Sequence, residues 1–149
     1  MAKKTEHPRQ QAPKTPEQME ADARGELAFW VDELRSERDR AKASVIAWTA
    51  RVEGDMLRAF HWAEDAFDAA ALHAVLSEAI EMSERGHSWE EIREEMIKGA
   101  MQSARYPSRS TSACANRAEQ AKGKALAEAA DSLRRIAALE QRLAKPVTA

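Results

Sequence analysis

The sequence predicts an all-α protein: a helical bundle of long amphipathic helices with coiled-coil character and a central helix-turn-helix-like unit. Glycine and proline number only five each, while Ala, Glu, Leu and Arg, which favour helix, are abundant. Apolar residues also recur every three, four and seven positions, the spacing of one helix face. At 149 residues the chain is about the size of one domain. We expect a disordered basic tail over 1–14 and a single helical domain over 15–145.

The first expected helix, 15–53, has a strong start signal. Thr15 can cap it, Pro16 suits the first helical position, and Gln18 completes a capping box. We expect a break at Gly54-Asp55, where glycine disfavours helix. A narrow apolar stripe follows the helix through Leu27, Trp30, Val31, Leu34, Ala41, Val45, Trp48 and Val52.

The second helix is expected over 55–85. Gly86 stands directly after it, where a left-handed residue commonly ends a helix. Its broad apolar face consists of Met56, Leu57, Phe60, Phe67, Leu72, Leu76, Ile80 and Met82.

The third helix, 88–105, has Ser88 as its cap with Glu91 three positions later, which is a second capping box. Tyr106-Pro107 ends it, because the residue before proline is displaced from the helical region. This stretch therefore contains the clearest helix boundaries in the chain.

The fourth helix is expected over 111–145, after a run of hydroxyl residues. Its apolar positions follow a heptad repeat that Glu140 interrupts. Such a thin seam needs a partner, so the long helices pair either within one chain or across a homodimer, and we expect a homodimer. The heptad positions are Leu126, Ala129, Leu133, Ile136 and Leu143.

Charge divides the chain into three parts, although the net charge is only −2. Residues 1–16 hold four cationic side chains against one carboxylate, a net +3. Residues 53–96 hold twelve carboxylates against three arginines, a net −9. Residues 97–124 hold six cations against Glu119, a net +5. The basic segment predicts contact with an anionic partner.

Several classes of site are not expected. Cys114 is the single cysteine, so no disulfide can form within the chain and no cysteine zinc cluster is possible. The polar N-terminus and the lack of long apolar runs argue against a signal peptide and a membrane span. We expect a cytoplasmic protein with no membrane association.

Metal and enzyme interpretations are also weak. The acidic and histidine residues of 61–73 are better explained as solvated side chains than as ligands. A di-iron bundle needs two Glu-x-x-His pairs, and only Glu84 and His87 match. Carboxylate pairs at 78/81 and 91/94 have the spacing of magnesium-binding helices without the accompanying lysine or asparagine. Nucleophile and phosphate-loop motifs are absent. We expect no enzyme activity, no metal and no cofactor.

The segment 86–117 contains two motifs. The first consists of Gly86, Trp89 and Ile92, and the second of Arg109, Ser110, Ala113, Cys114 and Arg117. Together the two motifs resemble the Myb/SANT class of three-helix DNA-binding domains, over about 72–122. The distance from Ile92 to the second motif is nearer that of the longer plant trihelix type. The resemblance implies that the third helix of the unit lies in the major groove, with a cysteine facing the core.

The residues themselves support a nucleic-acid interpretation of the same segment. On a helix starting near 111, several polar positions share one outer face. Asn and Gln can pair with adenine, Arg with guanine, and Lys with phosphates. We expect double-stranded DNA as the partner, and an ordinary solvated helix face is the competing interpretation. The candidate DNA-binding residues are Arg105, Arg109, Ser112, Asn116, Arg117, Gln120 and Lys124.

An alternative function follows from the acidic segment 53–96. Dense carboxylates can occupy a groove that otherwise binds phosphates. The chain would then be a protein-interaction module, an inhibitor or adaptor of the phage or plasmid type, that docks on a basic protein. The residues that would make this contact are Glu90, Glu91, Glu94 and Glu95.

Overall fold

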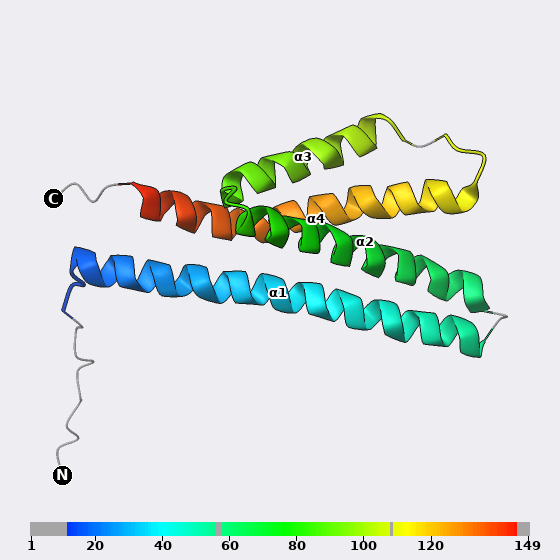
Figure 1. Cartoon of the computed structure of the whole chain (residues 1–149), viewed down its shortest axis with the longest axis horizontal. Coiled ribbons are helices and arrows are strands. Elements are labelled where there is room, and N and C mark those ends of the chain that lie inside the picture. Colours follow the sequence, from blue (N-terminus) through cyan, green and yellow to red (C-terminus); the bar gives the residue numbers. More distant parts are fainter. Residues whose placement is uncertain (1–11, 56–57, 108, 146–149) are drawn as a thin grey trace, which may run out of the picture.

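Four helices make up the part of the chain that this computed structural model describes, which is residues 12–55, 58–107 and 109–145 (Figure 1). Helix α1 spans Pro16–Gly54, α2 Ala59–Glu84, α3 Trp89–Arg105 and α4 Ala113–Ala144. These ranges contain no strand, so the all-α prediction is confirmed. Most of the expected tail, 1–11, lies outside the described residues, as do 56–57 and the side chains of 60–61 from the second apolar face and the metal interpretation.

Local capping explains where the helices begin and end. Thr15 Oγ1 accepts a hydrogen bond from the Gln18 amide at 3.2 Å, and the Gln18 side chain accepts one from the Thr15 amide at 3.0 Å. Ser88 and Glu91 repeat this reciprocal pair at the start of α3. Gly86 has a φ of 96°, the left-handed region that ends α2 without steric strain. The predicted starts of α1 and α3 are therefore confirmed.

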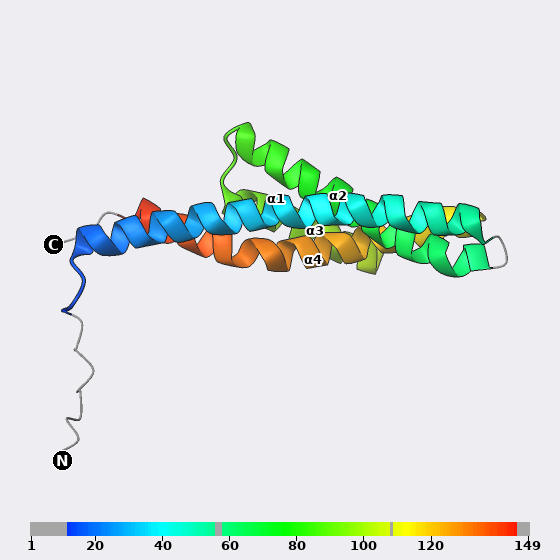
Figure 2. The ribbon, with the colours of Figure 1, turned by 90° about the horizontal axis from the view of Figure 1, so that it is seen from below.

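The helices form two antiparallel hairpins, α1 with α2 and α3 with α4 (Figure 1). Helices α2 and α4 each contact all three other helices, and α4 contacts α3 and α2 more extensively than α1. Helix α4 also contacts α1, and both views show the two helices running along the long direction of the bundle (Figures 1 and 2). Helix α3, with 17 residues, covers only part of the 32-residue α4.

The core lies where the four helices overlap. Its largest fully buried side chains are Leu76, Ile92, Leu133 and Ile136. Five of the eight buried residues of α4 are alanines, which lets neighbouring helices approach closely. The stripe of α1 around Leu34 packs on this cluster, so α2 and α4 together cover the thin apolar face of α1 within the chain.

Glu140 has a structural role that its place in the heptad does not reveal. Its Oε1 atom accepts a hydrogen bond from the backbone amide of Trp89 at 2.8 Å. The first amides of a helix have no partner within the helix, and a carboxylate there also interacts favourably with the helix dipole. Glu140 therefore joins the C-terminal part of α4 to the start of α3.

Candidate nucleic-acid interface

The described residues of the connection from α3 to α4, 106–107 and 109–112, contact both helices through backbone and hydroxyl groups. Tyr106 caps α3, and its amide donates to the Gln102 carbonyl at 2.9 Å. Ser112 caps α4, since its hydroxyl accepts from the Ala115 amide at 3.3 Å. The Ser112 amide in turn donates to Ser110 Oγ at 3.1 Å. These contacts fix the turn relative to the two helix ends.

Arg105, Arg109 and Gln120 are the candidate DNA-binding residues whose side chains are exposed and, among the described residues, form no hydrogen bond or ion pair. Arg105 lies in the last turn of α3, Arg109 in the connection, and Gln120 on α4. Ser112 is also exposed, but its hydroxyl is engaged in capping α4.

Arg117 and Lys124 face α2 instead of sharing an outer face with the other candidates. Arg117 Nη2 donates to Asp68 Oδ1 at 2.9 Å and to the Glu64 carbonyl at 3.3 Å. Lys124 Nζ donates to Asp68 Oδ2 at 3.2 Å. Positions seven residues apart lie in one row on a helix, and this row points at Asp68. The expectation of one outer polar face on α4 is therefore wrong, because α2 supplies a carboxylate to part of it.

Asn116 is turned toward the connection. Its Nδ2 group donates to the Ser110 carbonyl at 2.8 Å, and within the described residues its Oδ1 atom is buried with no hydrogen-bond partner. This side chain stabilises the turn before α4, so its amide is not directed outward for pairing with a base.

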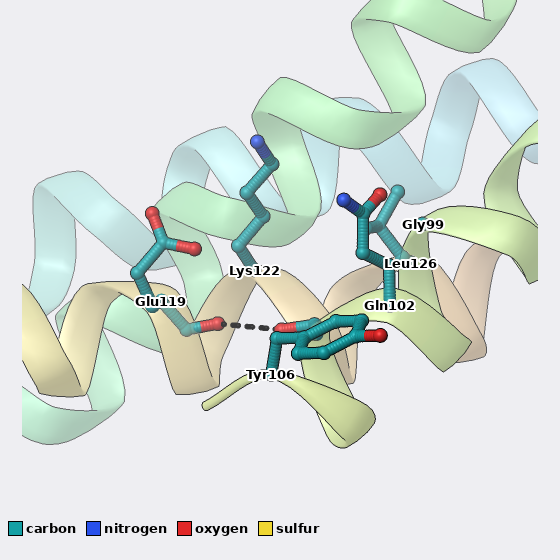
Figure 3. Close-up of a pocket in the computed structure, with 7 residues that line it drawn as sticks. Gly99, Gln102, Tyr106, Glu119, Lys122 and Leu126 are labelled. Atoms are coloured by element: carbon teal, nitrogen blue, oxygen red, sulfur yellow. Dashed lines mark hydrogen bonds between the residues drawn. The ribbon is translucent and has the colours of Figure 1, made fainter. Parts of the chain in front are cut away.

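Two surface hollows flank the C-terminal half of α3, and both are bordered by Tyr106 and Gln102. The first, of about 290 Å³, lies between α3 and α4. Figure 3 shows Glu119 and Lys122 of α4 on one side of it, and on the other Gln102 of α3 and Tyr106, the residue that follows this helix. Its remaining lining residues are Gly99, Ser103 and Leu126.

The second hollow, of about 280 Å³, is lined by Lys98, Met101, Gln102, Arg105 and Tyr106. Lys98 donates to Glu95 at 3.0 Å, and this hydrogen bond, followed by the charge of Glu95, raises the pKa of the Lys98 ammonium. Lys98 is therefore cationic at neutral pH, and the second hollow is bordered by two positive charges.

Sequence reasoning did not identify the aromatic and amide members of this region. Tyr106 served there only as a helix stop, and Gln102 had no assigned role. An aromatic residue next to a proline, with cationic residues nearby, could have indicated a binding surface. Whether the aromatic ring is exposed, however, depends on how α3 packs. In the structure the Tyr106 side chain is exposed, with a relative accessibility of 70%.

The carboxylates of the alternative interface are mostly engaged within the chain. Glu90 lies 3.8 Å from Arg93, and Glu91 belongs to the capping box. Glu95 pairs with Lys98. Among the described residues, Glu94 is exposed and has no hydrogen-bond or ion-pair partner.

Within the described ranges, no group of three or more His, Cys, Asp or Glu side chains has the arrangement of a metal site. None of the four described helices combines the length and apolar character needed to cross a membrane. No family model, curated protein or solved structure matches the chain.

Proposed function

We propose that the protein is a non-enzymatic DNA-binding or DNA-associated accessory protein that contacts phosphates through one end of the α3–α4 hairpin. This surface, the basic end, consists of Lys98, Arg105, Arg109 and Lys122. All four side chains are exposed, and three of them border the two hollows around Tyr106. That gathering of accessible cations is the observation that supports the proposal.

Nucleic-acid backbones are the natural partners of such a surface. Each phosphate that a cationic side chain neutralises releases a condensed counterion, which favours binding at low salt. Arg105 and Arg109 can also make bidentate hydrogen bonds to phosphate oxygens. Arg117 and Lys124 contribute less in this proposal, because Asp68, which is about three-quarters buried, already compensates their charge. Lys98 also has a carboxylate partner, Glu95, but both side chains of that pair are exposed, so the pair is weak and a phosphate can replace Glu95.

The experiment is a fluorescence anisotropy titration of the full chain with a labelled DNA duplex at several salt concentrations. If the four cations of the basic end each neutralise one phosphate, log affinity falls against log salt with a slope of about −3.6. The double variant Arg105→Ala, Arg109→Ala should bind more weakly and reduce the magnitude of the slope by about 2.

The control variant removes the same charge elsewhere. Arg40 and Arg134 have side-chain exposures of 64% and 71% and lie outside the basic end. The double variant Arg40→Ala, Arg134→Ala should bind DNA as the unchanged protein does. Equal losses in both double variants would indicate a non-specific charge effect, and no binding at low salt would refute the proposed function.

A basic protein partner on the acidic side of α3 is the second candidate. Of the four carboxylates proposed for this contact, Glu94 is the one that still supports it, since the other three already have partners within the chain. Neutralising Glu94 with Glu94→Gln leaves the basic end intact, so loss of a protein partner by this variant would favour the second candidate. Light scattering of the same sample tests the expected homodimer.

A further inference from the structure

Tyr106 is a large, exposed aromatic side chain at the C-terminal end of α3. Its amide is bound to the Gln102 carbonyl, and Pro107 follows it directly. Because the backbone is already ordered, contact with a ligand costs less conformational entropy here than in a flexible loop. The ring is therefore ready to form a stacking contact.

The two hollows give this ring a setting that suits an unpaired nucleotide. Lys98 and Arg105 border one of them and Lys122 borders the other. A base can stack on an aromatic ring while neighbouring cations hold the phosphates on either side of it. The Gln102 amide, which borders both hollows, can donate to and accept from a base edge.

A duplex matches this arrangement less well. Bases in a double helix stack on each other and present only their edges in the grooves, whereas an exposed ring between two hollows needs an open base face. The basic end supplies charge complementarity to the backbone in either case. The aromatic ring is the element that distinguishes the two forms.

We infer that the basic end binds single-stranded nucleic acid, with a base stacked on Tyr106 and phosphates held by Lys98, Arg105 and Lys122. This inference rests on the proposed function and specifies the form of nucleic acid that is bound. Base and phosphate are shared by DNA and RNA, so the test includes both.

The binding experiment compares oligothymidylate and oligouridylate of about 12 nucleotides with a DNA duplex of similar length. We expect the full chain to bind a single strand more tightly than the duplex. Tyr106→Ala should weaken single-strand binding by about tenfold, since loss of one stacking contact has an effect of that order, and should leave duplex binding unchanged. Tyr106→Phe keeps the ring and should retain the affinity. The tighter of the two single strands identifies the natural source.

The matched control is Phe29→Ala, which removes an aromatic side chain that is 57% exposed on α1. It should bind all three oligonucleotides as the unchanged protein does. Thermal unfolding of the Tyr106 variants should match that of the unchanged protein, because the ring contributes little buried area.

A spectroscopic measurement reports the contact directly. Tyr106 is the single tyrosine of the chain, so incorporation of 3-fluorotyrosine produces one ¹⁹F resonance. Oligothymidylate should shift it more than the duplex does, because a stacked base lies directly on the ring. An unshifted resonance would overturn the inference, as would single-strand binding by Tyr106→Ala equal to that of the unchanged protein. Salt-dependent DNA binding in the same experiments would still support the proposed function. Absence of binding to every oligonucleotide at low salt would refute both.

Discussion

Asp68 of α2 accepts hydrogen bonds from two cations of α4, and its contact with Arg117 measures 2.9 Å between Oδ1 and Nη2. The Arg117 and Asp68 side chains are about three-quarters buried, with exposures of 24% and 26%. This carboxylate therefore ties two hairpins together and also withholds positive charge from solvent.

The first prediction concerns Asp68→Asn, which keeps the shape of the side chain and removes its charge. Loss of a charge-assisted contact should lower the free energy of unfolding by about 1–2 kcal/mol. It should also release Arg117 and Lys124, so DNA affinity at low salt rises several-fold. Urea denaturation and anisotropy measure the two effects. Asp131→Asn, at an exposed ion pair with Arg134, is the control and should change neither. Unaltered DNA affinity in Asp68→Asn would show that these cations lie outside the binding surface.

The second prediction concerns the approach of α3 to α4. A Cβ atom at Gly123 would lie 2.6 Å from Ser103 Oγ and 3.0 Å from Ser103 Cβ. Rotating the hydroxyl cannot relieve the second contact, so Gly123→Ala forces the two helices apart. We expect a loss of about 1–2 kcal/mol in place of the usual gain from alanine in a helix.

The control for this prediction is Gly99→Ala, whose Cβ would meet the flexible end of Leu126 at 3.0 Å. That variant should have unchanged or slightly increased stability. Adding Ser103→Gly to Gly123→Ala should recover part of the loss, and a double-mutant cycle by urea denaturation measures the coupling. Additive effects would contradict the close approach.

The third prediction addresses the cap that Glu140 provides to α3. Glu140→Ala leaves the Trp89 amide without its carboxylate partner and should cost about 1 kcal/mol. Glu140→Gln keeps an acceptor and should cost less. Gln141→Ala, at the exposed neighbouring position, is the comparison for changes in α4 alone. Equal midpoints of unfolding for the alanine variants at 140 and 141 would argue against a contribution from this cap.

The fourth prediction concerns pH. Burial between α1 and α4 raises the pKa of the Glu37 carboxyl above its ordinary value of 4.5, and the charges of Glu128 and Glu33 act in the same direction. A hydrogen bond from Ser132 and the charge of Arg40 oppose them. A carboxyl with a raised pKa binds its proton more tightly in the folded protein, so its stabilising contribution is present below pH 4.5 and is lost as pH rises through the folded value.

Glu37→Gln should therefore raise the midpoint of thermal unfolding at pH 7, with a difference that shrinks toward pH 4. Ser132→Ala removes the hydrogen bond that opposes the shift, so it should lower stability at pH 7 more than at pH 4. A Glu37→Gln protein whose advantage is the same at both pH values would refute this account.

The helix ends could be predicted from sequence because they depend on residues only a few positions apart. Thr15 with Gln18 and Ser88 with Glu91 form their capping boxes locally, and Gly86 ends α2 by its own backbone freedom. The division of the polar face of α4 could not be predicted in this way. It depends on Asp68, 49 residues before Arg117, and helix periodicity does not reveal which neighbour a face will meet.

For the same reason, the sequence does not determine whether the long helices pair within one chain or between two chains. An apolar stripe shows that α1 needs a cover and does not show which helix provides it. The sequence also does not show that Tyr106 is exposed, since an aromatic residue at a helix end is equally compatible with a core position.

The place of α4 in the chain constrains the order of folding. Helix α1 makes its most extensive contacts with α2, so these two helices can pair as soon as both have been synthesised, whereas α3 makes its main contacts with α4, which follows it. At about 5–20 residues per second, translation of the 32 residues of α4 takes about 2–6 s. Over that interval the apolar face of α3 lacks its main partner, so the α3–α4 hairpin is completed only after α4 has been made.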